Sequence, residues 1–210
     1  MFVKDQMKPT VITVTHSTSV LEALKLMQQH SIRRLPVLQN DKLVGIVTES
    51  DLLKVSPSPA TSLSIFEINF LISKMTVKEI MAKKPITVSP DATIEEAALI
   101  MRDKHVGGLP VMDEGKLVGI ISESDLFDAM IDLFGLKRSG KRLTIEVDDK
   151  QGVLADIARI MKDSNINIIN VANRKQSSGK VEIIARIDVK DADACVLTLE
   201  EHGFKVTHVN

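Results

Sequence analysis

Two kinds of apolar spacing alternate along the first two thirds of the chain, one typical of helices and one of strands. Apolar side chains recur at helical spacing over residues 20–27, at Val20, Ala23, Leu24 and Met27. Ser19 precedes Glu22 by three residues, as in a capping box, and marks where this helix begins. Short apolar runs predict strands at 12–14, 35–38 and 43–47. With a further helix from residue 49, the segment is expected to be β-α-β-β-α.

The same pattern occurs twice. Residues 3–54 align without a gap on residues 77–128 at a constant offset of 74, and 21 of the 52 aligned positions are identical. The longest identical runs are Leu35–Val37 with Leu109–Val111, Lys42–Ile46 with Lys116–Ile120, and Glu49–Leu52 with Glu123–Leu126. Such self-similarity indicates duplication. One unit is too small to bury both its helices and its sheet, so we expect the two copies to share a core.

Two apolar connectors flank the second copy. Pro57 and Pro59 interrupt regular structure, and residues 63–74 then predict a helix with Leu63, Phe66 and Phe70 on one face. Residues 127–136 form the second connector. Two interpretations stay open: these helices belong to the core, or they form a homodimer surface. The expected boundaries are 1–60 and 77–135 for the repeats, 61–76 for a linker helix, and 141–210 for a C-terminal domain.

From Lys141 the pattern changes. Apolar and polar residues alternate over 143–147 and 181–189, which predicts strands with one buried face. An amphipathic helix over 153–162, an extended segment over 167–174, a helix from Asp191 and a strand from Phe204 complete the order βαββαβ, which is ferredoxin-like. The fold class is therefore α/β (α+β): two β-α-β-β-α repeats packed as a pseudo-two-fold pair, followed by this domain.

Composition excludes several classes of function. The net charge is −1 without a basic stretch, and Trp and Tyr are absent, so we expect no nucleic-acid partner. No apolar run approaches eighteen residues and no signal-like segment opens the chain, so we expect a cytoplasmic protein without a membrane partner. Cys195 is the only cysteine and the five histidines share no ligand spacing, so we expect no metal site and no cofactor.

A hydroxyl and a carboxylate recur where the last strand of each repeat meets a helix. Thr48 precedes Asp51 and Ser122 precedes Asp125 by three residues. Helix N-terminal amides favour phosphate, and a carboxylate accepts hydrogen bonds from a ribose diol. The same spacing also caps helices, and capping alone accounts for a single copy. No nucleophile, P-loop or dinucleotide motif accompanies these residues, so we expect no enzyme activity.

On these residues, with the Leu-Pro-Val strand and the Gly-h-h-Thr/Ser-x-x-Asp ending in both copies, residues 1–135 resemble CBS domains, which pair into Bateman modules. The resemblance implies a regulatory adenosine ligand, AMP, ADP, ATP or S-adenosylmethionine, in the cleft between repeats. It implies two pseudo-symmetric sites. One comprises Thr48, Asp51, Lys84, Pro85 and Ile86, and the other comprises Ser122, Asp125, Thr10, Val11 and Ile12.

The two sites are not equivalent. Arg33 and Arg34 stand where nucleotide-binding members of that family place basic residues toward phosphate, and paired guanidiniums offer bidentate donors to phosphate oxygens. Adjacent arginines are also common as a solvated surface pair. The second repeat has Gly107 and Gly108 instead, which lack charge but let backbone approach a ligand closely. We therefore expect one occupied site rather than two.

Residues 141–210 resemble an ACT domain, through the turn from Asp149 to Leu154 and the segment Asn165–Ile168. The resemblance implies an amino-acid site at Asp149, Gly152, Val153, Leu154 and Asn167. Turn formation also accounts for Gly152, and strand entry also accounts for Asn167. The order CBS, CBS, ACT resembles the AcuB-type acetoin-utilisation family. It implies a regulatory protein, which we expect to be a homodimer, and the alternative is a dimerisation or protein-interaction module with degenerate clefts.

Overall fold

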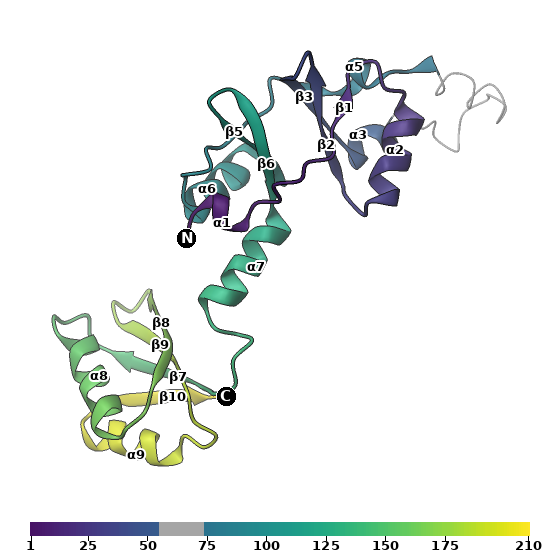
Figure 1. Ribbon diagram of the computed structural model, residues 1–210. Helices are drawn as coiled ribbons and strands as arrows, with labels where there is room; N and C mark the ends of the chain where they lie inside the picture. The colour runs from purple at the N-terminus through teal and green to yellow at the C-terminus, as the bar shows by residue number, and fades with distance from the viewer. Residues whose placement is uncertain (55–73) are drawn as a thin grey trace, which may run out of the picture. The chain divides into compact units, whose positions relative to one another are not determined.

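The computed structural model describes residues 1–54 and 74–210, in two compact units of residues 1–126 and 127–210 (Figure 1). Each unit is described by itself. The helix predicted over 63–74, and Pro57 and Pro59 before it, lie outside the described residues apart from Lys74 at its end. In the described parts of the chain, no helix is both long enough and apolar enough to span a bilayer.

The first unit confirms the duplicated β-α-β-β-α order. In the first repeat, β1 (Val14–Thr15), β2 (Arg34–Gln39) and β3 (Lys42–Thr48) form a sheet with β4 (Ala82–Lys83), beside helices α2 (Val20–Gln29) and α3 (Glu49–Lys54). The second repeat has helix α6 (Ile94–Lys104) and the hairpin β5 (Gly108–Asp113) and β6 (Lys116–Ser122), followed by helix α7 (Glu123–Leu133). Single bridges Val88–Val111 and Lys8–Ile120 extend this hairpin at the positions where β1 and β4 pair in the first repeat.

Local signals in the sequence set where the helices begin. Ser19 Oγ accepts the Glu22 amide at 3.2 Å at the start of α2. Thr93 Oγ1 does the same for Glu96 at the start of α6, and the Glu96 carboxylate accepts the Thr93 amide at 2.8 Å. These bonds satisfy amides that the first helical turn leaves unpaired. The predicted capping positions are therefore confirmed.

A short segment before each repeat is exchanged with the other repeat. Helix α1 (Val3–Gln6) buries Val3 fully in the core of the second repeat, and α5 (Val77–Ile80) buries Val77 fully in the core of the first. The Val3 amide donates to Ala92 O and the Val77 amide to Thr18 O. The repeats thus keep two separate cores and complete each other's, where the sequence suggested one shared core. Each repeat by itself lacks an apolar residue at the position that the exchanged valine fills.

Two glycines make room for this exchange. A Cβ at Gly119 would collide with Met7 Sδ, and a Cβ at Gly45 would lie 2.5 Å from Met81 Sδ. Gly45 and Gly119 occupy equivalent positions in β3 and β6, so the methionine behind each exchanged helix packs directly on strand backbone. In Figure 1, α1 accordingly lies beside α6 and the β5–β6 hairpin rather than beside the repeat that follows it in the sequence.

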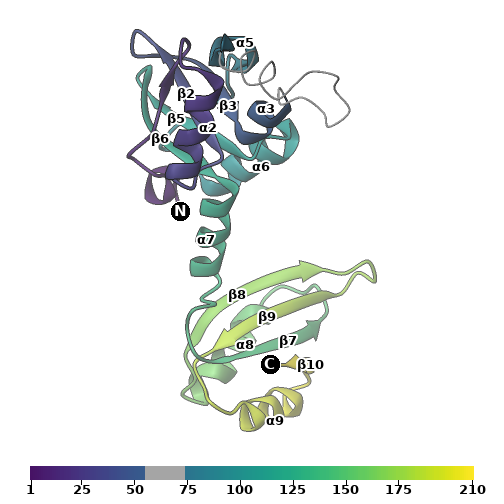
Figure 2. The same cartoon turned by 90° about the vertical axis from the view of Figure 1, so that its right-hand side faces the viewer.

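The second unit has the predicted βαββαβ order. Its antiparallel sheet runs β10 (Lys205–Val209), β7 (Lys141–Val147), β9 (Val181–Ile187) and β8 (Ile168–Lys175). Helices α8 (Val153–Asp163) and α9 (Asp193–Glu201) cover one face of this sheet (Figure 2). Alternate strand residues such as Leu143, Ile145 and Ala185 point into the core between them. The other face, called the open face below, carries the intervening residues.

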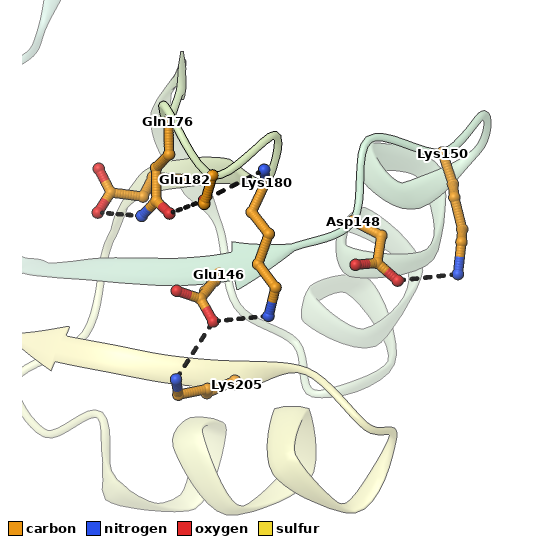
Figure 3. A network of polar contacts seen from close by, with 8 residues as sticks. Glu146, Asp148, Lys150, Gln176, Lys180, Glu182 and Lys205 are labelled. Atoms are coloured by element: carbon orange, nitrogen blue, oxygen red, sulfur yellow. Dashed lines mark hydrogen bonds and ion pairs between the residues drawn. The ribbon is translucent and has the colours of Figure 1, made fainter.

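Charged side chains are interlinked at one end of the open face (Figure 3). Glu146 Oε1 accepts hydrogen bonds from Lys180 Nζ at 3.0 Å and from Lys205 Nζ at 3.2 Å. Glu182 accepts from Arg174 and from Gln176. Because these donors favour the ionised form, they lower the pKa of Glu146 and of Glu182 below the ordinary glutamate value.

Shortening Val3 tests the exchange. We expect Val3→Ala to lower the free energy of unfolding of the chain by about 2 kcal/mol, because two fully buried methyl groups leave the second repeat's core. Leu21→Ala is the control: it removes more carbon from a side chain that is 44% exposed on α2, and should change stability by less than about 0.5 kcal/mol. Equal effects in urea unfolding would contradict the exchanged core.

Acid titration tests the Glu146 contacts. Because the pKa of Glu146 is lower in the folded protein, its contribution to stability is complete above the ordinary glutamate pKa. It is lost as the pH falls through the lowered value. We expect Lys205→Met to move the pKa of Glu146 upward in an NMR titration, and Lys190→Met, which removes an exposed lysine outside these contacts, to leave it in place. An unchanged pKa in Lys205→Met would contradict the assignment.

Candidate functional site

A cavity of about 140 Å³ lies between the two repeats, and residues of both line it. It brings together all five residues of one of the two predicted sets, and Arg33 and Arg34 with them. The predicted residues around it are Thr10, Val11, Ile12, Arg33, Arg34, Ser122 and Asp125. Lys8, Ser31 and Glu123 line it as well, and sequence reasoning missed them. For Lys8 the repeat offset carries a signal, because the aligned residue of the other copy is Ala82, so the two copies differ in charge there.

The carboxylate of Asp125 is held at the start of α7. Ser122, the last residue of β6, donates to Asp125 Oδ2 from its amide at 2.8 Å and from its hydroxyl at 2.6 Å. Lys8 Nζ lies 3.7 Å from the other oxygen, Oδ1. Asp125 is only 7% exposed. One oxygen thus caps the helix while the second faces Lys8 at the cavity, so the capping and ligand-binding interpretations apply to different oxygens of the same residue.

Arg34 crosses from the first repeat onto the glycine pair of the second. A Cβ at Gly107 would lie 2.8 Å from Arg34 Nη2, and a Cβ at Gly108 would collide with Arg34 Nη1. The glycines therefore admit the guanidinium, where the sequence suggested close approach of a ligand. Gly108 itself is buried and does not line the cavity. Burial lowers the pKa of Arg34, and the nearby Glu123 carboxylate partly offsets that effect.

Glu123 and Asp125 act electrostatically on Arg34, but neither forms an ion pair with it in the part of the chain that the structure describes. Neither the Arg33 nor the Arg34 side chain forms a hydrogen bond or an ion pair there. Only Lys8, of the three cations around the cavity, has a carboxylate within 4.0 Å. A partly desolvated guanidinium with free donors favours an anion with several oxygens.

The second predicted set is arranged differently. Thr48 donates to Asp51 Oδ2 from its amide at 3.1 Å and its hydroxyl at 2.6 Å, as Ser122 does for Asp125. The Asp51 side chain is 28% exposed, against 9% for Asp125, and pairs with Lys54 on its own helix at 3.5 Å. Neither these residues nor Lys84, Pro85 and Ile86 line the cavity. The pair of repeats is therefore symmetric in backbone and asymmetric in charge.

The predicted residues of the C-terminal domain separate into two places. Asp149, Gly152, Val153 and Leu154 line a depression at the start of α8, together with Asn173 of β8. Asn167 lies elsewhere, beside Lys162 and Asn165. The structure therefore does not bring Asn167 to the other four. Asn173, which the sequence reasoning missed, pairs in register with the buried Ile183, so strand alternation places it on the helix-covered side. Asp149 is paired with Lys175 at 3.0 Å.

Comparison with known families identifies both kinds of domain. The CBS domain family matches residues 3–58 and 77–132, and the TTHA0829-like ACT domain family matches residues 139–210. The chain therefore belongs to the CBS-domain family and carries a C-terminal ACT domain. Both are regulatory modules.

Solved structures resemble the CBS pair. The CBS pair of protein MJ0100, in complex with 5′-methylthioadenosine and S-adenosylmethionine, is 30% identical and covers 62% of this chain and 99% of that one, with a TM-score of 0.52. CBSX2 of Arabidopsis thaliana, in complex with AMP, is 31% identical over 65% and 98% of the two chains, with a TM-score of 0.53. A Vibrio cholerae protein assigned to acetoin utilization (AcuB) is 31% identical over 65% and 95%, with a TM-score of 0.54.

Proposed function

We propose that the chain is a regulatory sensor that binds a phosphate-bearing adenosine nucleotide in the cavity between its CBS repeats. The observation that carries this proposal is that Arg33 and Arg34, which form no ion pair or side-chain hydrogen bond among the described residues, line the same cavity as the buried carboxylate of Asp125. A phosphate requires cationic donors and a ribose requires a fixed acceptor, and the cavity offers both.

Each part of a nucleotide has a partner of matching chemistry. The Oδ1 oxygen of Asp125, which does not accept from Ser122, can accept hydrogen bonds from ribose hydroxyls when a ligand displaces the Lys8 side chain. Arg33 and Arg34 can donate in bidentate fashion to phosphate oxygens. Val11 and Ile12, from the segment that leads into β1, supply apolar contacts for the base. Thr48 and Asp51, with Lys84, Pro85 and Ile86, would form a second and weaker site.

Charge favours AMP-like ligands over the other adenosine compounds. Lys8, Arg33 and Arg34 oppose Glu123 and Asp125 around the cavity, which leaves an excess of positive charge. 5′-Methylthioadenosine brings no phosphate, and the sulfonium of S-adenosylmethionine would meet like charge. The CBSX2 complex with AMP supports this preference, and the MJ0100 complex provides the contrasting ligands.

Regulation would act through helix α7. The Asp125 carboxylate lies in its first turn, and its last turn leads into the ACT domain, so α7 connects the site to that domain along the chain. A ligand changes a regulated state only if it binds two arrangements with different affinity. The depression at Asp149 and Gly152 would then bind a second effector, an amino acid. A cytoplasmic homodimer remains our prediction for the working form.

Melting experiments test the nucleotide site. At a hundredfold excess over its Kd, a ligand stabilises by about 2.7 kcal/mol, which for this size raises Tm by roughly 5 to 10 °C. We expect that increase with AMP, and a much smaller one with 5′-methylthioadenosine or S-adenosylmethionine. Exchanging both arginines for glutamine should remove the difference between AMP and 5′-methylthioadenosine. Unchanged melting with every adenosine compound would overturn the proposal.

The two aspartates provide a matched pair within that test. Asp125→Ala should abolish the AMP-dependent increase in Tm, and Asp51→Ala, which removes the equivalent cap in the other repeat, should retain most of it. If Asp51→Ala abolished the increase and Asp125→Ala retained it, the ligand would bind at the Thr48 and Asp51 site instead.

A second candidate function, a protein-interaction module, is favoured by one observation. Phe127, Met130 and Leu133 of α7 are 64%, 46% and 48% exposed and follow one another at three-residue spacing. Large exposed apolar side chains in a row are typical of interaction surfaces. We expect Phe127→Glu to convert a dimer to a monomer in light scattering, while Leu197→Glu, at a 61% exposed residue of α9, leaves the mass unchanged. A dimer that survives Phe127→Glu would exclude this surface.

A further inference from the structure

The open face of the ACT sheet carries two cross-strand pairs of like charge. Glu146 of β7 is in register with Glu182 of β9, and Arg142 of β7 is in register with Arg186 of β9. Residues 143, 145, 147, 183, 185 and 187 point into the core, so strand alternation places all four charged residues on the opposite face. Like charges directly opposite each other on neighbouring strands destabilise a sheet unless something compensates them.

The fold compensates the acidic pair internally. Glu146 accepts from Lys180 and Lys205, and Glu182 accepts from Arg174 and Gln176, as Figure 3 shows for most of these residues. Three cations and an amide therefore surround two carboxylates.

The basic pair has no such compensation in the described parts of the chain. Arg142 Nη1 donates to Thr144 Oγ1 at 3.1 Å, and Arg186 Nη1 donates to Arg138 O at 3.4 Å, so both guanidiniums bond only to neutral oxygens. No carboxylate of these parts lies within 4.0 Å of either guanidinium. Both side chains are partly buried. The opposite end of the same face thus contains two half-buried arginines, and no carboxylate of the described residues forms an ion pair with either.

A third arginine, Arg138, lies beside Arg186. The Cδ atoms of Arg138 and Arg186 are each 3.9 Å from the point where Gly135 would carry a Cβ, so both side chains lie against the turn after α7. Arg138 too lacks an ion pair within the described ranges 1–54 and 74–210. Asn170, the register neighbour of Arg186 on β8, donates to Leu133 O at 3.0 Å and holds the end of α7 against this part of the sheet.

We propose that Arg142, Arg186 and Arg138 form an anion site on the open face of the ACT domain, and that its ligand is a phosphate group. Guanidiniums bind phosphate and carboxylate oxygens in bidentate pairs. Two or three fixed positive charges match a phosphate dianion better than a single carboxylate, which would leave charge uncompensated. This site is separate from the depression at Asp149 and from the cavity between the CBS repeats, and it stands independently of the proposed nucleotide site.

Phosphate bound at this site would also affect the segment that connects α7 to β7. Arg186 already bonds to the carbonyl of Arg138, and Arg138 belongs to the segment between α7 and β7. A phosphate bound by these arginines would join that segment more firmly to the ACT sheet. The ACT domain would therefore respond to a phosphorylated metabolite or to free phosphate at a place distinct from its turn at Gly152.

Calorimetric titration of the full chain with inorganic phosphate tests this site. Arg33→Gln and Arg34→Gln are introduced first, so that phosphate binding between the CBS repeats does not contribute. In that background we expect one phosphate per chain. Adding Arg142→Gln or Arg186→Gln should weaken binding by about tenfold or more, because each removes charged hydrogen bonds to the ligand.

Arg174→Gln is the matched control. It removes the same charge from the same face, but its guanidinium is already paired with Glu182. We expect Arg174→Gln to bind phosphate as tightly as the background variant does. If Arg174→Gln and Arg142→Gln lost affinity equally, the binding would come from the overall positive charge of the face, and the proposed site would be wrong. Arg142→Lys, which retains the charge but loses the planar fork, should also weaken binding, and it serves if Arg142→Gln fails to fold.

The relative affinities for different anions show whether the site binds a phosphorylated metabolite or free phosphate. Binding of glycerol 3-phosphate at least as tight as that of inorganic phosphate supports a phosphorylated metabolite, and binding of inorganic phosphate alone supports free phosphate. Acetate bound as tightly as phosphate would overturn the assignment to a dianion. Absence of phosphate binding in the Arg33→Gln, Arg34→Gln background would overturn the proposal altogether.

Discussion

The exchange of Val3 and Val77 between the repeats is the constraint on which the rest of the first unit depends. Each valine completes the core of the repeat to which it does not belong in the sequence, and Met7 and Met81 pack on backbone that only glycine leaves open. The exchange brings Lys8 into a bridge with Ile120 of the second repeat, and the segment after it returns along the cavity to the first repeat, where Ile12 packs. Residues far apart in the sequence therefore line one cavity because the repeats cannot close their cores separately.

Within this symmetric backbone, a few substitutions make the two halves chemically different. The same hydroxyl and carboxylate begin α3 and α7, with closely similar hydrogen bonds. Only the half that contains Asp125 also has Lys8 and the two arginines of the first repeat. The glycines that replace those arginines in the second repeat accommodate Arg34. The second repeat therefore has no arginine at these positions, and the missing side chains leave room for the guanidinium of Arg34 from the first repeat.

The ACT domain distributes charge in a comparable way. One face of its sheet is covered by α8 and α9, and Arg142, Glu146, Glu182 and Arg186 of the two central strands lie on the open face. There the acidic pair is compensated by neighbouring lysines and an arginine, and the basic pair is not. Arg138 and Arg186 lie against the turn that follows α7.

The sequence by itself determined the duplication, the element order of both units and the caps at Ser19 and Thr93, because helix and strand periods and capping bonds are local. It also named half of the residues that line the cavity, through their resemblance to CBS domains. Only the tertiary structure decided that Val3 crosses to the second repeat, that Arg34 occupies the space over Gly108, and that Asn173 rather than Asn167 accompanies Gly152. Those contacts join residues distant in the chain, where packing and burial, not local preference, select the partner.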